Sequence, residues 1–158
     1  MLSLYIYSLL ISYAVSLLGS VFSTKGLPWY FSQIRRPSWT PSGKIIGMVW
    51  TVLFGLIGIA GGMLWSLHPA NAGTIIALFV ANGLLNIGWS YVFFYKHKLN
   101  AAVVVSVLLE VSVLTIVFSA FPLSVWAGIL LLPYAAWVLF ATYLSFRIAR
   151  MNKNVSQR

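Results

Sequence analysis

Long hydrophobic segments with almost no charge follow one another along the chain, separated by shorter connections, and the Lys and Arg residues lie outside these segments or at their ends. A helix needs about 20 apolar residues to cross the hydrocarbon core of a bilayer, and each of these segments is long enough. The run that follows Glu110 is too long for one crossing, and Phe121-Pro122 divides it at a natural helix end. The pattern therefore predicts five membrane-spanning helices, at about residues 2–24, 45–67, 72–95, 99–121 and 123–147.

The composition indicates a membrane protein. Hydrophobic residues make up 61% of the 158 residues and charged residues only 7%, whereas a soluble domain has about 25% charged residues. The length suits one domain, so residues 1–158 are expected to form a single all-α integral membrane domain, a five-transmembrane-helix bundle. The absence of cysteine excludes disulfides, thiolate metal sites and cysteine nucleophiles.

The basic residues all fall on one side of the predicted topology. They follow the first and third spans or lie from the end of the fifth onward: Lys25, Arg35, Arg36, Lys44, Lys96, Lys98, Arg147, Arg150, Lys153 and Arg158. Because cytoplasmic segments carry the excess of Lys and Arg, we expect a multi-pass protein of the cell membrane with its N-terminus outside and its C-terminus and first loop in the cytoplasm. Orientation and lipid contact account for these cations, so nucleic acid is not an expected partner.

The first predicted loop, residues 25–44, differs in composition from a flexible linker. It contains three prolines and four aromatic residues, whereas flexible linkers are rich in glycine and serine. Long connections in compact domains are often binding loops or lids, so this segment is expected to be a structured lid over a pocket. The alternative is a loop that only packs on lipid headgroups through Trp29 and Trp39.

The tryptophans divide into two groups by their depth in the predicted spans. Trp65 and Trp126 lie at the outer ends of their helices, where an aromatic belt is expected. Trp50, Trp89 and Trp137 lie six to ten residues in from the cytoplasmic end, which corresponds to a depth of roughly 9–15 Å. Belt residues do not lie so deep, so these three are expected to share one level beneath the loop.

Helical periodicity places polar and small residues beside the deep tryptophans. Asn82 and Asn86 share a face with Trp89, and several glycines share a face with Trp50. Asparagine in hydrocarbon needs hydrogen-bond partners. The simple explanation is helix packing, and Gly58-x-x-x-Gly62 fits the small-residue packing motif. Pro133, Trp137 and Ala141 form a third stripe, on the fifth span. Three such stripes at one depth favour an apolar pocket with a few polar anchors.

Three motifs in this arrangement resemble one known family. They are RPSWTP at 36–41 followed by GMVW at 47–50, LNIGW at 85–89 followed by FF at 93–94, and LPYAAWVLFATYL at 132–144. Together they resemble the signature of the TspO/translocator-protein family, the tryptophan-rich sensory proteins also described as peripheral-type benzodiazepine receptors. The resemblance extends from about residue 29 to residue 147, and it is that of a bacterial member.

This resemblance implies a membrane receptor or sensor, usually a homodimer, with a pocket under the first loop. The family binds porphyrins such as protoporphyrin IX and isoquinoline-carboxamide or benzodiazepine drugs. Some bacterial members degrade protoporphyrin in light, and Trp50 and Trp137 match the tryptophans implicated in that reaction. The ligand-binding residues expected from the resemblance are Tyr30, Phe31, Trp39, Pro41, Ile46, Trp50, Phe54, Asn86, Trp89, Ser90, Trp137 and Ala141.

One motif departs from the family pattern. The family places a Trp-Tyr pair one residue closer to the Lys/Arg-Pro of the loop than Trp29-Tyr30 lies in this chain. Either Tyr30 reaches the pocket through a bulge, or Phe31 takes its place without a hydroxyl.

The charge pattern suggests how a porphyrin would be oriented. Arg35, Arg36 and Lys44 lie at the expected cytoplasmic mouth of the pocket, where they could contact the two propionates. No cofactor and no metal are expected, since His68 and His97 lie at opposite faces of the predicted bundle and cannot share one ion.

Glu110 is the only acidic residue and lies near the middle of the fourth span. An ionisable residue at that depth is by default a functional candidate, and we expect it to be protonated or hydrogen-bonded. It supports an alternative function, a small proton-coupled multidrug transporter.

Sequence patterns bear on two further partners. Tyr143-x-x-x-Arg147 fits a weak cholesterol pattern, but a helix-end anchor explains it better, so cholesterol is not an expected ligand. A homodimer is expected to use Ala77-x-x-x-Ala81 or Gly58-x-x-x-Gly62 as its small-residue face.

Overall fold

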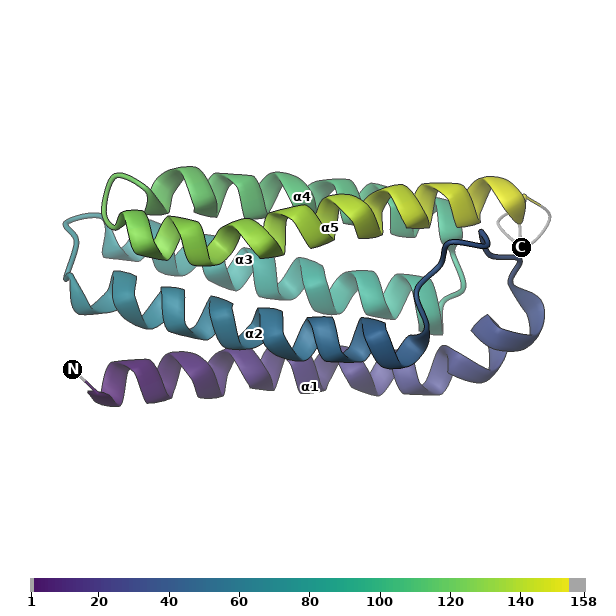
Figure 1. Cartoon of the computed structure of the whole chain (residues 1–158), viewed down its shortest axis with the longest axis horizontal. Helices are drawn as coiled ribbons and strands as arrows, with labels where there is room; N and C mark the ends of the chain where they lie inside the picture. The colour runs from purple at the N-terminus through teal and green to yellow at the C-terminus, as the bar shows by residue number, and fades with distance from the viewer. Residues whose placement is uncertain (1, 154–158) are drawn as a thin grey trace.

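The computed structural model describes residues 2–153 and shows a bundle of five long helices, with no strand among those residues (Figure 1). The helices are α1 (Leu2–Gln33), α2 (Gly43–Ser66), α3 (Ala72–Ser90), which continues as the short π-helix η1 (Tyr91–Tyr95), α4 (Leu99–Ala120) and α5 (Val125–Met151). Each is long and apolar enough to cross a membrane. The expectation of an all-α, five-helix membrane bundle is confirmed.

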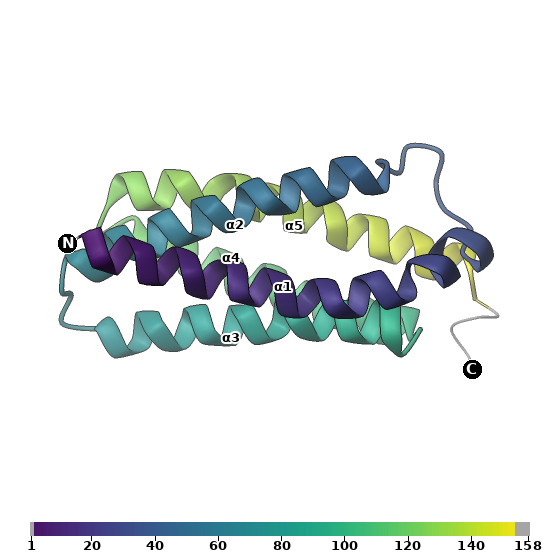
Figure 2. The same cartoon turned by 90° about the horizontal axis from the view of Figure 1, so that it is seen from below.

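Consecutive helices run in opposite directions along the bundle (Figures 1 and 2). Helix α1 packs on α2 and α3, α2 packs on α5, and α4 packs on α3 and α5. These contacts close a ring in the order α1, α2, α5, α4, α3. Side chains from all five helices can therefore meet in its interior.

One end of the bundle holds the basic residues. The α1–α2 loop, the η1–α4 connection and the end of α5 lie together there (Figure 1). Nine of the ten cations lie in these segments or in the adjoining helix ends, from Lys25 in α1 to Lys153 after α5. The tenth, Arg158, lies outside the described residues. We call this the basic end.

Helix α1 is longer than the sequence pattern predicted. It continues to Gln33 through Pro28, so the connecting loop covers residues 34–42 rather than 25–44. A proline inside a helix costs a hydrogen bond and a clash, and the last turns of α1 bend away from its axis (Figure 1). Aromatic packing compensates, since the Trp29 ring stacks on His97 with 3.9 Å between centroids and Tyr30 packs on Phe93.

The 34–42 loop is fixed to the end of α5 by one side chain. Asn152 accepts a hydrogen bond from the Arg35 backbone N–H at 2.9 Å and donates one to the Arg35 carbonyl at 2.8 Å. A further turn closes where the Thr40 N–H donates to the Pro37 carbonyl at 3.1 Å. The loop is therefore structured, as predicted, although it is shorter.

The Gly58-x-x-x-Gly62 motif packs α2 against α1 within one chain. A Cβ atom at Gly58 would lie 2.9 Å from the Leu9 Cα, and one at Gly62 would lie 3.0 Å from the Tyr5 Cα. Such distances require glycine, because the two backbones are in near contact. This motif is thus unavailable as a dimer face, and that alternative is wrong.

Candidate functional site

Tyr134 of α5 is the centre of a buried hydrogen-bond network. Its hydroxyl donates to Asn82 Oδ1 at 3.0 Å and accepts from Asn86 Nδ2 at 3.4 Å, and Asn82 Nδ2 donates to Ser112 Oγ at 2.8 Å. The network joins α3, α4 and α5. The intramembrane asparagines therefore find protein partners, as polar groups in hydrocarbon require.

One of the deep tryptophans lies against this network. The Trp50 ring lies 6.2 Å from Tyr134 and 5.7 Å from Phe54. The Trp89 ring instead stacks on Phe93 of η1 at 5.1 Å. Edge-to-face and offset contacts at such distances stabilise aromatic pairs, so Trp50 is packed against the network and Trp89 against the rings of η1.

The 34–42 loop places one aromatic ring, that of Trp39, on α5. Trp39 stacks on Tyr143 with 5.7 Å between centroids and lies 5.8 Å from Phe140, whose ring is 5.3 Å from Trp137. Aromatic contacts therefore run from the loop to one of the deep tryptophans. Trp39 packs on α5, which agrees with a loop that covers the bundle interior.

Two indole N–H groups in this region have no acceptor. Trp89 Nε1 and Trp137 Nε1 are buried and make no hydrogen bond. Buried indole N–H groups normally find a partner, and an unpaired buried donor costs free energy. Each is a donor that an acceptor on a bound molecule could use.

The structure distinguishes between Tyr30 and Phe31. Tyr30 is 7% exposed and packs against Phe93 and Phe94, whereas Phe31 is 51% exposed. No bulge is needed, because both residues are helical and point to different sides of α1. Tyr30 is thus the inward residue of the pair.

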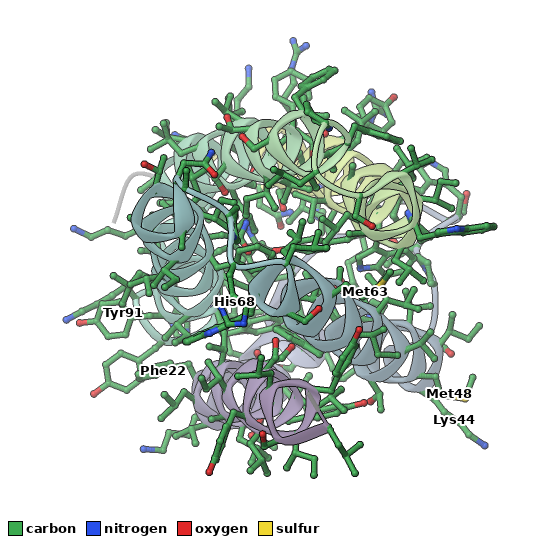
Figure 3. The ribbon with its side chains drawn as sticks, turned by 90° about the vertical axis from the view of Figure 1, so that its left-hand side faces the viewer. Phe22, Lys44, Met48, Met63, His68 and Tyr91 are labelled. Carbon is green, nitrogen blue, oxygen red and sulfur yellow. The ribbon has the colours of Figure 1, made fainter. Side chains whose placement is uncertain are left out.

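The three cations expected at the mouth are arranged differently from one another. The Arg36 guanidinium lies over the rings of Tyr30 and Phe31, at 5.0 and 4.8 Å from their centroids. The Arg35 side chain is exposed on the loop. Lys44 is exposed and points away from the bundle (Figure 3).

The remaining expected ligand-binding residues are not all in one place. Ser90 is buried against α1, where a Cβ at Gly19 would lie 3.4 Å from its Oγ. Pro41, Ile46 and Ala141 are half-buried. The structure brings Trp50 and Asn86 to Tyr134 and sets Ser90 against α1. Trp89 packs on Phe93, and Trp137 packs on Phe140.

A cavity among the described residues lies elsewhere in the bundle. It measures about 440 Å³ and lies between α1, α2 and α3, extending from the α2–α3 turn toward the middle of the bundle. Phe54 is the one expected ligand-binding residue among its lining side chains. Sequence reasoning did not anticipate this cavity.

The sequence did not single out two residues that join distant parts of the structure, Tyr134 and Asn152. Tyr134 is part of the motif at 132–144, and a tyrosine in the middle of a hydrophobic span indicates a buried polar partner. Asn152 follows the last helical residue and carries no such local signal.

Among residues 2–153, no group of three or more His, Cys, Asp or Glu could hold a metal ion.

Known proteins resemble this chain over most of its length. A family model described as "TspO/MBR family" matches residues 8–151. The chain is 36% identical over 143 residues to "Tryptophan-rich protein TspO" of Chlorobaculum tepidum, with 88% of this chain and 89% of the relative covered. It is 30% identical to "Tryptophan-rich sensory protein" of Cereibacter sphaeroides, with 80% and 78% covered. It is 28% identical to "Translocator protein" of Homo sapiens, with 81% and 77% covered.

Proposed function

Since the chain belongs to the TspO/MBR family, we propose that it is a membrane receptor or sensor for tetrapyrroles such as protoporphyrin IX. Isoquinoline-carboxamide and benzodiazepine-type drugs would use the same site. The observation that supports this most directly is the pair of buried, unpaired indole N–H groups of Trp89 and Trp137. An acceptor atom on a bound aromatic ligand would satisfy either donor.

The proposed site lies between Trp50, Trp89 and Trp137, beside the hydrogen-bond network of Tyr134. A porphyrin disc would replace ring-to-ring contacts of these side chains with ring-to-ligand contacts of similar kind. Such a site is apolar with a few polar anchors, which is typical of small-molecule pockets. Trp39 and the 34–42 loop would close the site toward the basic end.

The propionates of the porphyrin would meet the cations of the loop. Arg35 and Arg36 are on the 34–42 loop, and Arg36 is already held close to the expected site by the Tyr30 ring. Arginine binds carboxylates through paired hydrogen bonds. Because the Lys44 side chain points away from the bundle, we assign the propionate contact to the two arginines rather than to Lys44.

Replacement of Arg35 by glutamine is expected to weaken protoporphyrin binding between about twofold and fivefold, since an exposed ion pair contributes at most about 1 kcal/mol. The loop should stay in place, because Asn152 holds Arg35 through backbone atoms. The measurement is a titration of purified protein with protoporphyrin at low and high salt. The loss should shrink at high salt.

The matched control is Lys44→Gln, which removes the same charge from a side chain that points away. An uncharged isoquinoline ligand serves as a second control and should bind Arg35→Gln normally. Equal weakening of both ligands would mean that Arg35 acts on loop structure, and the propionate contact would then be abandoned. Arg36→Gln removes a cation–π contact as well, so it is expected to weaken both ligands.

The proposed function includes light-dependent degradation of the bound porphyrin. Trp50 and Trp137 are the residues proposed to take part, because indole is oxidised more readily than the phenylalanine rings beside it. The bound pigment would absorb the light, and these side chains would supply electrons or quench the excited pigment. No cofactor is proposed.

A second candidate function rests on Glu110. Its Oε2 atom is buried and has no hydrogen-bond partner among the described residues. An unpaired carboxylate within a membrane span is a feature of proton-coupled transport. Proton-driven drug uptake by vesicles that contain the protein, abolished in Glu110→Gln, would favour this transporter over the receptor.

The proposed location is the cell membrane, with the basic end in the cytoplasm and the N-terminus outside. The chain has no cysteine, so single cysteines at Arg35, Lys98 or Lys153 are expected to react with an impermeant thiol reagent only from the cytoplasmic side. A cysteine at Ala70, in the α2–α3 turn at the other end, should react only from outside. Reaction of any of the first three from outside would overturn this orientation.

We also propose a homodimer that uses α3. Ala77 and Ala81 are exposed on its surface, and small residues four apart let helices approach closely in a membrane. Because Gly58 and Gly62 are covered by α1, this face is the one of the two small-residue motifs that remains open to a partner.

A further inference from the structure

We propose that the cavity between α1, α2 and α3 is a second ligand site that binds a long-chain fatty acid, with the chain in the cavity and the carboxylate at His68. This site is separate from the tetrapyrrole site. Its volume of about 440 Å³ lies within the range of about 300–1,000 Å³ that is usual for small-molecule sites. It lies toward the end of the bundle opposite the basic end.

The cavity opens sideways toward the lipid. Its lining includes Leu18 of α1 and Val80 and Leu84 of α3, which are all strongly exposed on the outer surface of membrane-spanning helices. In the membrane these side chains face hydrocarbon rather than water. A ligand can therefore enter from the bilayer without crossing an aqueous phase.

The walls of the cavity suit a hydrocarbon chain. They are mostly apolar, with Ile57, Ile75 and Phe79 among them. The deeper polar side chains are already engaged, because the Ser12 hydroxyl donates to the Phe54 carbonyl at 2.6 Å and Asn82 bonds Tyr134 and Ser112. The inner part of a bound molecule is therefore apolar. A polar head belongs at the outer mouth.

His68 lies at that mouth. Seen from this end, it lies over the opening between α1, α2 and α3 (Figure 3), and it lines the cavity together with Trp65. Its backbone is left-handed, with φ of 45°, at a helix end where glycine is the usual residue. Histidine is one of the residues that adopt this conformation more often than most.

The distribution of Lys, Arg and His in the structure indicates which head group the ligand in this cavity would carry. The nine described Lys and Arg residues belong to the basic end, so His68 is the one imidazole or cationic side chain of residues 2–153 at this opening. A phosphate head group prefers several donors, whereas one imidazole can donate a single charge-assisted bond to a carboxylate. An opening with a single imidazole and one apolar cavity behind it therefore suits a single-chain carboxylic acid better than a two-chain phospholipid.

The test measures quenching of tryptophan fluorescence by 2-bromohexadecanoate in the detergent-purified full chain. The bromine next to the carboxyl group should lie near Trp65 and quench it on contact. We expect saturable quenching that is lost in Trp65→Phe and reversed by hexadecanoate. Methyl hexadecanoate, which lacks the charge, should compete at least about threefold less well, as expected for loss of a charge-assisted bond at a wet mouth.

Two variants of His68 separate the side chain from the backbone. Asparagine and glycine both tolerate the left-handed conformation, so His68→Asn and His68→Gly should fold normally and bind the acid about threefold to tenfold more weakly. Unchanged affinity in both, together with equal competition by the methyl ester, would overturn the fatty-acid assignment. It would mean that bulk lipid chains fill the cavity without recognition of the head group.

Two neighbouring residues of α1 test whether the acid binds in this cavity. Ile11 lines the cavity and is 58% exposed, whereas its neighbour Leu10 is 62% exposed and does not line it. Ile11→Phe should reduce quenching and Leu10→Phe should not, and equal effects would place the binding elsewhere. Protoporphyrin binding should be normal in all of these variants, so this proposal and the tetrapyrrole proposal can fail independently.

Discussion

Replacement of Trp50 or Trp137 by phenylalanine is expected to slow light-driven degradation of protoporphyrin by at least about tenfold, the effect of roughly 1.4 kcal/mol on a barrier. Phenylalanine keeps most of the apolar contact, but its ring is much harder to oxidise than indole. Binding should therefore survive better than degradation. It should be nearly unchanged in Trp50→Phe and somewhat weaker in Trp137→Phe, which also loses an indole N–H proposed to bond the ligand. The measurement is loss of pigment absorbance under illumination at equal occupancy of the site.

The two substitutions differ in their structural cost. Trp137 carries a buried N–H without an acceptor, so Trp137→Phe removes an unsatisfied donor, which offsets part of the cost of the smaller ring beside Phe140. Trp50 contacts Phe54 and Tyr134 through its ring, and Trp50→Phe leaves a smaller ring beside them. Thermal unfolding of both variants would show whether a slower reaction reflects chemistry or disturbed packing.

The control for this experiment is Trp65→Phe. Trp65 is exposed at the opposite end of the bundle, so its loss removes one tryptophan without touching the proposed site. Wild-type bleaching in Trp50→Phe and Trp137→Phe would show that these residues are only walls of the pocket. The receptor proposal would survive that result, and the photochemical one would not.

Replacement of Gly26 by alanine is expected to lower the stability of the protein strongly. A Cβ atom at Gly26 would lie 2.6 Å from the Cβ of Phe94 and 2.8 Å from its carbonyl carbon. Backbone atoms of η1 cannot rotate away as a flexible side chain could. Helix α1 must then move off η1, and overpacking of this kind typically costs about 1–3 kcal/mol.

The same displacement should reach the proposed site. Trp29 and Tyr30 follow Gly26 by one helical turn and pack on His97 and Phe93. We expect a lower unfolding temperature together with weaker porphyrin binding. Both can be measured on detergent-purified protein.

Gly47 provides a matched control with the opposite expected sign. A Cβ atom there meets nothing within 4 Å, and alanine is favoured over glycine inside a helix by roughly 0.5–1 kcal/mol. Gly47→Ala should therefore stabilise the protein or leave it unchanged. Similar destabilisation by both substitutions would show that the close approach of α1 to η1 is not what requires glycine at position 26.

Most of the helical architecture was predictable because each span is a continuous apolar segment. The predicted span 45–67 compares with Gly43–Ser66, and 99–121 compares with Leu99–Ala120. The end of α1 was not predictable by the same rule. Lys25, Gly26 and Pro28 are all signals of a helix end, and contacts of the following aromatic residues with distant parts of the chain override them.

The proposed site was predictable in its residues but not in its organisation. The family motifs indicated Trp50, Asn86, Trp89 and Trp137. That the asparagines would be bound by Tyr134 depends on the relative rotation of α3 and α5, which no local pattern encodes. The cavity between α1, α2 and α3 depends likewise on how far apart those helices lie.

The hydrogen bonds between Asn152 and Arg35 join residues that are 117 positions apart in the sequence. As a result, the C-terminal end of α5 moves together with the 34–42 loop. A purification tag fused immediately after Met151 would disturb that attachment, so a spacer beyond Lys153 is advisable in any expression vector.

The same attachment makes the region useful for spectroscopy, because a small dye placed just after Lys153 would change its emission when the loop separates from α5.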